Sequence, residues 1–246
     1  MNRAPDLAEE VMVVTGAARG LGHEITLELL ERGAQVVAGC SGDPAPLELL
    51  AEKWPGQVWP VVGDIGEEET SVRLIAQAAR LGGPTAILHN AAISRDSLLV
   101  RTTIEEWEDV QRVNLGGAFL LSKHAVRAMM RARRGRLVYI SSISAVLGNA
   151  GQASYAASKA GLDGLSRSIS QEYARYGIQS CVLAAGLIDV GLGARLGEQD
   201  QQAKLSRVLL GAAQPRDMAR IAAFLASPAA NYINATTVRA DGGVRF

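Results

Sequence analysis

The chain has 246 residues, and its 25 basic and 25 acidic side chains give a formal net charge of zero at pH 7. This balance gives no general attraction to nucleic acid or to an anionic membrane surface, so we expect neither as a partner. Hydrophobic residues make up 48% of the chain. That is enough for the core of one large α/β domain, and we expect residues 1–246 to form a single domain.

The cysteines and the first residues bear on the cellular compartment. Cys40 and Cys181 are far apart and make neither a metal-binding pattern nor a disulfide framework. The first ten residues are polar and acidic, without the apolar core of a signal peptide. No apolar run approaches the ~20 residues of a membrane span. We therefore expect a cytoplasmic protein without a metal site or a membrane segment.

Short apolar runs alternate with amphipathic segments along the chain. The runs predict strands at 11–14, 35–39, 58–62, 85–89, 136–141, 179–183 and 237–240. The amphipathic segments predict helices at 21–32, 47–53, 67–80, 103–131 (with a break near 114–117), 154–176 and 215–226. Apolar strands separated by helices are typical of a parallel sheet covered on both faces. The expected fold is a Rossmann-type, doubly wound α/β sheet of about seven strands.

A glycine-rich stretch follows the first expected strand directly and opens a helix. Glycines there let the backbone turn tightly and approach a pyrophosphate, which binds at the helix N-terminus. The alternative is a strand-to-helix turn in which the glycines supply only backbone flexibility. The position between strand and helix favours a dinucleotide site, with contacts from Gly16, Arg19, Gly20, Leu21 and Gly22.

The end of the second strand indicates which dinucleotide binds. An acidic residue there would bind the ribose 2′-hydroxyl of NAD. This chain has Ser41 near that position, and Asp43 comes later. Arg19 in the glycine turn could meet a 2′-phosphate. We therefore expect NADPH, held by Arg19 and Ser41. The alternative is NADH bound by Asp43, with Arg19 a solvated loop charge.

Tyr155 and Lys159 are four residues apart in an expected helix, so they lie on the same face. An ammonium beside a phenol favours the phenolate, and we expect the pKa of Tyr155 to fall below its reference of about 10. Such a tyrosine can exchange a proton near neutral pH. Helices often show this spacing by chance, so its meaning depends on the other motifs.

Taken in order, the motifs resemble those of the classical short-chain dehydrogenase/reductase family over nearly the whole chain. The matching features are the glycine turn and, after it, Asp64, His89-Asn90-Ala91-Ala92, Asn114, Ser142, Tyr155 and Lys159. Within the family the chain is most similar to the bacterial 3-oxoacyl-acyl-carrier-protein reductases. This closer similarity rests on residues 93–101, 105–107, 127–130, 148–155 and 240–243.

The resemblance implies catalytic roles. Tyr155 would donate a proton to a ketone oxygen, and Lys159 would lower the pKa of Tyr155 and hold the nicotinamide ribose. Ser142 would orient the substrate carbonyl, with Ser141 and Ser144 as competitors for that role. Asn114 would hold a water that connects Lys159 to solvent. Further cofactor contacts would come from Asp64, Ile65, Asn90, Ala91 and Ile188.

Several residues have alternative interpretations. Asn114 could simply break a helix, because asparagine tolerates the left-handed backbone. His89 could look like a catalytic base, but it ends a buried strand and we expect a structural histidine. Ala92, Ala185 and Val190 stand where the family has Gly, Pro and Thr. These departures motivate a weakly active partner subunit of a hetero-oligomeric reductase as one alternative.

Arginines 127, 131, 133, 134 and 136 form a basic run before the fifth strand. The run could be a solvated helix end, or it could dock an acidic carrier protein. The resemblance implies docking through Arg133. The family's second docking arginine corresponds to Tyr176, with Arg175 adjacent.

Together these features predict NADPH-dependent reduction of a 3-oxoacyl thioester, bound to acyl carrier protein, to the 3-hydroxyacyl thioester. The pathway would be fatty-acid or related polyene or polyketide biosynthesis. The same-fold alternative is a CoA-bound substrate such as acetoacetyl-CoA, or a small ketone or alcohol. The resemblance implies a homotetramer with the helices around Asn114 and Tyr155 between subunits, a hetero-oligomer being the alternative. Residues 191–213 would form the lid that sets acyl length.

Overall fold

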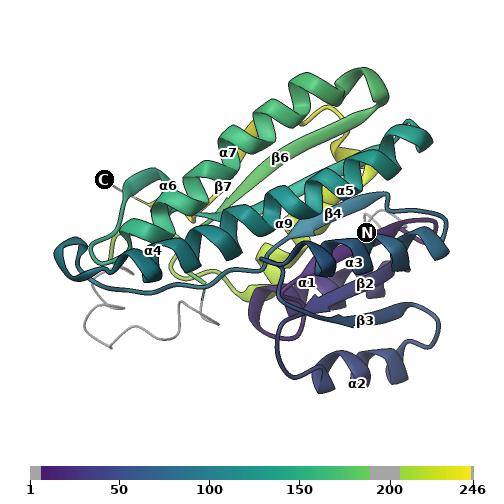
Figure 1. Cartoon of the computed structure of the whole chain (residues 1–246), viewed down its shortest axis with the longest axis horizontal. Helices are drawn as coiled ribbons and strands as arrows, with labels where there is room; N and C mark the ends of the chain where they lie inside the picture. The colour runs from purple at the N-terminus through teal and green to yellow at the C-terminus, as the bar shows by residue number, and fades with distance from the viewer. Residues whose placement is uncertain (1–6, 189–205, 245–246) are drawn as a thin grey trace.

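The computed structural model describes residues 7–188 and 206–244 of the chain. In these residues seven strands form one parallel sheet in the order β3-β2-β1-β4-β5-β6-β7, as Figure 1 shows. The expected doubly wound α/β fold is therefore confirmed. The strands are β1 Val11–Thr15, β2 Gln35–Cys40, β3 Val58–Val62, β4 Ala86–His89, β5 Gly135–Ser142, β6 Ile178–Ala185 and β7 Thr236–Ala240.

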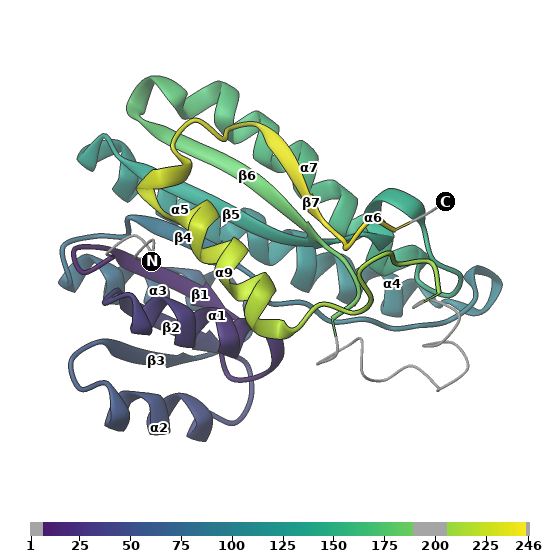
Figure 2. The ribbon, with the colours of Figure 1, turned by 180° about the vertical axis from the view of Figure 1, so that it is seen from behind.

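Helices cover both faces of the sheet. Helices α3, α5 and α7 cover one face (Figure 1), and α1 and α9 cover the other (Figure 2). The helices are α1 Gly20–Glu31, α2 Ala45–Lys53, α3 Glu68–Arg80, α4 Ile104–Gln111, α5 Gly117–Ala132, α6 Ser144–Leu147, α7 Ala153–Tyr173 and α9 Pro215–Ala226.

The core consists of two apolar layers, one on each face of the sheet. Successive side chains of a strand point to opposite faces. In β1, Met12 and Val14 therefore pack in the layer under α1 and α9, whereas Val13 packs in the layer under α3, α5 and α7. All three are completely buried. This explains why the strands read as continuous apolar runs in the sequence.

The strand order creates a crevice at one edge of the sheet. β1 lies between β2 and β4, so the chain winds outward in one direction from β1 to β3 and in the other from β4 to β7. Ligands of such sheets bind outside the carboxyl ends of the strands at this reversal point. The site is therefore expected between the loops that follow β1 and β4.

The long expected helix 103–131 is interrupted as predicted, but not by a left-handed residue. Residues Arg112–Gly116 form a π-helical turn between α4 and α5. Among the described non-glycine residues only Arg133 and Ala235 have positive φ. The interpretation of Asn114 as a left-handed helix breaker is therefore wrong. π-Helical turns occur frequently at functional sites.

The remaining differences lie at element ends. The expected helix 154–176 ends at Tyr173 and continues as a 3₁₀ turn, Ala174–Tyr176. The short helix α6 was not predicted. Among the described residues, none of the helices has the length and apolar character needed to cross a membrane.

Candidate active site

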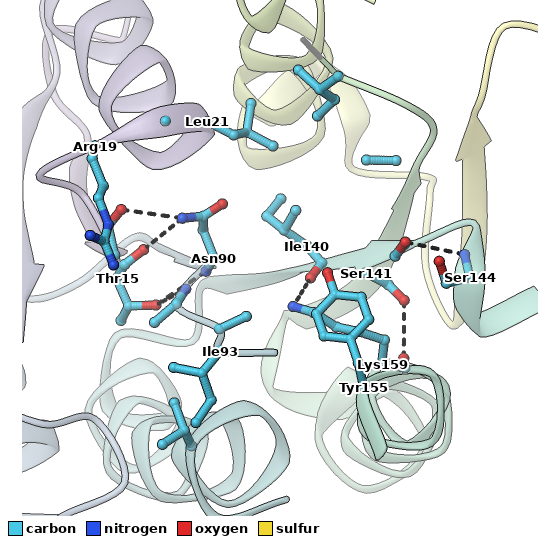
Figure 3. A pocket seen from close by; sticks show the side chains of 18 of the residues that line it. Thr15, Arg19, Leu21, Asn90, Ile93, Ile140, Ser141, Ser144, Tyr155 and Lys159 are labelled. Carbon is cyan, nitrogen blue, oxygen red and sulfur yellow. Dashed lines mark hydrogen bonds between the residues drawn. The ribbon is translucent and has the colours of Figure 1, made fainter. Parts of the chain in front are cut away.

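A cleft of about 930 Å³ lies at the carboxyl ends of the strands. It brings together most of the residues that the sequence singled out, and Figure 3 shows several of them around it. Four of the predicted residues do not line the cleft. Gly22 and Asn114 lie behind its wall, and Arg133 and Arg175 lie away from it. The predicted residues that line the cleft are Gly16, Arg19, Gly20, Leu21, Ser41, Asp64, Ile65, Asn90, Ala91, Ser142, Tyr155, Lys159 and Ile188.

The glycine turn forms one end of the cleft and fits a phosphate group. Gly16 and Gly20 have φ values of 66° and 58°, which L side chains rarely adopt. A Cβ on Gly22 would lie 2.1 Å from the Gly16 carbonyl oxygen. No side chain caps the start of α1 in the part of the chain that the structure describes. The first N–H groups of α1 are thus available to a pyrophosphate.

Thr15 and Asn90 hold this turn from behind. The Asn90 side-chain amide donates to the carbonyl oxygens of Thr15 and Gly16, both at 3.3 Å (Figure 3). The Thr15 hydroxyl oxygen accepts the backbone N–H groups of Asn90 and Ala91, at 3.1 and 3.0 Å. The Asn90 side chain therefore fixes the phosphate-facing turn, while the residue itself also lines the cleft.

The end of the cleft next to β2 carries three charged residues, Arg19, Asp43 and Asp64. The Arg19 side chain is exposed and has no hydrogen-bond or ion-pair partner among the described residues. The Asp43 carboxylate accepts the backbone N–H of Ala45 at 3.0 Å, at the start of α2. Asp64 accepts the Gly66 N–H at 2.8 Å and pairs with Arg112 at 2.8 Å. The two acidic groups are thus already engaged within the protein, whereas Arg19 is available to a ligand.

Tyr155 and Lys159 lie at the other end of the cleft. Lys159 is buried, and its Nζ donates to the Ile140 carbonyl oxygen at 2.7 Å (Figure 3). Burial raises the pKa of Tyr155 to about 12, and a hydrogen bond with Ser142 acts in the opposite direction. Burial lowers the pKa of Lys159 to about 7.

The predicted lowering of the Tyr155 pKa by Lys159 is therefore wrong for the protein by itself. The ammonium is directed at the Ile140 carbonyl and lies 5.8 Å from the centroid of the Tyr155 ring. Burial disfavours the phenolate, and the Asp96 carboxylate acts in the same direction. Tyr155 consequently remains protonated at neutral pH, which is the state that a proton donor needs.

The three neighbouring serines differ in their partners. The Ser141 hydroxyl donates to the Lys159 carbonyl oxygen at 3.0 Å, and the Ser144 hydroxyl donates to Gln152 at 3.2 Å. The Ser142 hydroxyl oxygen accepts the Ser144 N–H at 3.1 Å, and of the three serines it is Ser142 that lowers the pKa of Tyr155. The geometry thus favours Ser142 for the orienting role, which stays a prediction.

Asn114 is completely buried behind the cleft. Its amide nitrogen donates to the Ile93 carbonyl and to the Ser158 hydroxyl, both at 3.0 Å, and its amide oxygen accepts the Ile93 N–H at 2.8 Å. The side chain therefore fixes the loop after β4 to α7. The proposed water at Asn114 stays a prediction.

Sequence reasoning missed part of the cleft wall. Gln152 lines the cleft and bonds Asp96 at 3.0 Å and Asn149 at 2.8 Å. Its position three residues before Tyr155 could have indicated this. Val208, which belongs to the predicted lid segment 191–213, and Val244, which was not predicted, also line the cleft and form an antiparallel bridge. No local pattern reveals that pairing, because it joins distant segments.

The departures from the family pattern have modest structural effects. Ala92 lines the cleft with an ordinary backbone φ, so its methyl group causes no left-handed strain. The Ala185 carbonyl accepts the Ile143 N–H at 2.8 Å. Val190 and most of the predicted lid lie outside the described residues.

Comparison with known proteins identifies the family. A family model described as enoyl-(acyl carrier protein) reductase matches residues 16–245. The chain is 38% identical to the 3-oxoacyl-acyl-carrier-protein reductase FabG of Vibrio cholerae over 97% of this chain and 98% of that protein. The corresponding reductase of Escherichia coli K12 is 37% identical, over 96% and 97% of the two chains. That of Thermotoga maritima is 35% identical, over 97% and 98%.

The chain belongs to the short-chain dehydrogenase/reductase family. It is an NAD(P)-dependent oxidoreductase, as the sequence predicted. The match covers both the glycine turn and the Tyr155 end of the cleft, so the family assignment and the geometry describe the same site.

Proposed function

We propose that this enzyme uses NADPH to reduce a 3-oxoacyl thioester, carried on acyl carrier protein, to the 3-hydroxyacyl thioester. One observation carries the chemistry: a single cleft has the glycine turn at one end and the Ser142, Tyr155 and Lys159 side chains at the other. The substrate is supported by the relatives, each of which is named a 3-oxoacyl-acyl-carrier-protein reductase. The pathway would be fatty-acid or related biosynthesis.

Each of these side chains would have a separate role in carbonyl reduction. A nicotinamide bound in the cleft would supply the hydride that forms the new C–H bond. The Ser142 and Tyr155 hydroxyls donate hydrogen bonds to the ketone oxygen, which fixes the carbonyl. Tyr155 gives its proton to that oxygen as negative charge develops there. Lys159, when protonated, stabilises the phenolate that Tyr155 becomes, until a proton from solvent restores it.

NADPH rather than NADH is supported by the charges near β2. Arg19 is available to a 2′-phosphate, whereas Asp43 is engaged with the backbone of α2. A guanidinium–phosphate contact is charge-assisted and strong. Arg19→Ala should raise the Kd for NADPH about tenfold or more and leave the Kd for NADH nearly unchanged, measured by cofactor fluorescence. Equal changes in both would contradict this specificity.

The assembly and the carrier site are also proposals. Phe119 is 52% exposed on α5, and an apolar side chain there favours a homotetramer packed through α5 and α7. Arg133 and Arg175 flank the Tyr176 ring at 5.9 and 4.9 Å, which makes a compact cationic patch for an acidic carrier. A cytoplasmic location agrees with this partner.

Purified enzyme and a 3-oxoacyl-carrier substrate test the proposal. NADPH oxidation should be rapid, and Tyr155→Phe should lower kcat by ~10²–10⁴ while keeping NADPH affinity, because only the proton donor is removed. Activity that survives in Tyr155→Phe would assign the reaction to another site. A wild-type enzyme that binds NADPH but reduces no 3-oxoacyl thioester would favour a small-ketone reductase or a partner subunit.

A further inference from the structure

The end of β4 holds a histidine at the meeting point of three segments. His89 is completely buried. Its Nδ1 lies 3.2 Å from the Thr15 hydroxyl at the end of β1. Its Nε2 lies 3.2 Å from the Asn114 carbonyl oxygen in the π-helical turn. The imidazole therefore connects the glycine turn to the π-helical turn between α4 and α5, and each of its ring nitrogens has a hydrogen-bonding partner.

The hydrogen bonds fix which nitrogen carries the proton. The Thr15 hydroxyl oxygen already accepts two backbone N–H groups, from Asn90 and Ala91. A hydroxyl has one proton to donate, and His89 Nδ1 is its partner. Nδ1 is therefore unprotonated, and Nε2 carries the hydrogen that it donates to the Asn114 carbonyl.

The bridge continues to the catalytic helix. The Asn114 side chain accepts the Ile93 N–H and donates to the Ile93 carbonyl oxygen and to the Ser158 hydroxyl. The Ser158 hydroxyl in turn donates to the Tyr155 carbonyl oxygen at 2.7 Å. One hydrogen-bonded chain therefore connects the phosphate-facing turn to the start of α7, and His89 is its central member.

We propose that His89 is a positioning residue. As a neutral Nε2–H imidazole it holds the cofactor-facing turn 90–93 and the π-helical turn at fixed positions relative to Tyr155. It touches neither substrate nor cofactor. The inference rests on the proposed cofactor-dependent reduction, but not on the identity of the acyl substrate.

The surroundings keep the imidazole neutral. Burial and the nearby Lys159 charge both lower the pKa of His89, to about 3. Tyr139, whose ring lies edge-on with centroids 6.4 Å apart, is buried, and its own pKa is raised by that burial. Among the described groups facing His89 there is no carboxylate that would favour the charged form.

Two substitutions separate hydrogen bonding from packing. His89→Leu fills the space but leaves the Thr15 hydroxyl and the Asn114 carbonyl without their buried partner, which is costly. His89→Asn keeps one acceptor and one donor. We expect His89→Leu to raise the Kd and KM for NADPH about tenfold and to lower kcat, while His89→Asn stays within about threefold of the wild type.

The NADPH affinities of the two variants can support or overturn the proposal. A His89→Leu variant that folds and binds NADPH like the wild type overturns the proposal, as does a His89→Asn variant that fails equally while keeping the wild-type Tm. Loss of affinity in His89→Leu with recovery in His89→Asn supports it. Because NADPH binding is read directly, the result does not depend on finding the correct 3-oxoacyl substrate.

A second measurement needs no variant. ¹⁵N-histidine NMR of the wild-type protein should show one imidazole protonated at Nε2 only, and unchanged between pH 5 and 9, a range chosen about the ordinary histidine pKa. Detection of an Nδ1–H tautomer, or titration in this range by the signal that His89→Asn removes, would overturn the assignment.

Discussion

At the scale of the residue, Lys159 is placed where its charge is costly. Its ammonium is buried and donates to one carbonyl, and burial lowers its pKa to about 7. The helical spacing correctly predicted that Lys159 and Tyr155 would share one face of α7. The direction of the Tyr155 pKa could not be predicted, because burial of the phenol sets it and the Lys159 ammonium is directed at the Ile140 carbonyl, which only the fold reveals.

Lys159→Met tests this burial. The lysine pKa is lower in the folded protein than in the unfolded chain, so the unfolded state binds more protons between about pH 7 and 10.5. Wild-type stability should therefore rise with pH across this window. The Met variant should be more stable than the wild type at pH 7, by an amount on the order of a few kcal/mol, and this advantage should shrink toward pH 10. Urea unfolding measures it.

The comparison of the two proteins isolates Lys159, since every other titrating group is shared. An advantage of the Met variant that is the same at pH 7 and pH 10 would contradict the lowered lysine pKa. A Met variant less stable than the wild type at pH 7 would show that the Ile140 contact outweighs the cost of burial.

At the scale of the element, the glycine turn was the most predictable part of the site. Its sequence position predicted both the turn and the start of α1, because glycine adopts the left-handed φ of residues 16 and 20 without the steric cost of a side chain. The sequence did not predict that the interruption between α4 and α5 would be a π-helical turn. The sequence indicated a break near Asn114, but the wide turn is stabilised by contacts of Asn114 with Ile93 and Ser158, which come from other elements.

Gly22→Ala tests the close packing of this turn. The new methyl group would meet the Gly16 carbonyl oxygen and the Asn90 amide, so backbone must move. We expect at least a tenfold loss of NADPH affinity, about 1.4 kcal/mol, measured by fluorescence titration. Gly164→Ala is the matched control, because outside its own helix no described residue lies within 4 Å of its new methyl group. Equal affinity in the two variants would contradict the assigned geometry.

The start of α4 offers a test that is independent of function. The Thr103 hydroxyl accepts the Glu106 N–H at 3.2 Å, and Glu106 accepts the Thr103 N–H at 3.1 Å, which is a capping box. Thr103→Ala should lower the free energy of unfolding by about 1 kcal/mol, whereas Thr103→Ser should keep most of it. Similar losses in both variants would show that the threonine methyl group matters more than the cap.

At the scale of the whole molecule, alternating patterns were sufficient to predict the sheet and its helical layers. They could not place the proposed carrier site. Arg133 precedes β5 and Arg175 precedes β6, so both lie at the amino edge of the sheet, whereas Tyr155 lies at the carboxyl edge. The eight residues of β5 alone span ~26 Å between the two edges.

Charge reversal separates carrier docking from catalysis. Arg133→Glu should raise the KM for a carrier-bound substrate about tenfold, because an acidic partner is repelled, and leave the KM for the matching CoA thioester nearly unchanged. The cleft lies far from this position, so kcat should not change. Equal effects on both substrates, or none on either, would remove Arg133 from the docking surface.

The most direct test of the proposed function is the rate of NADPH oxidation by the purified wild-type enzyme and by Tyr155→Phe, with the same 3-oxoacyl chain on acyl carrier protein and on CoA. We predict rapid oxidation with the carrier-bound chain, a higher KM for the CoA thioester, and a loss of ~10²–10⁴ in kcat in the variant. No NADPH oxidation by the wild type with either thioester, despite NADPH binding, would contradict the proposal.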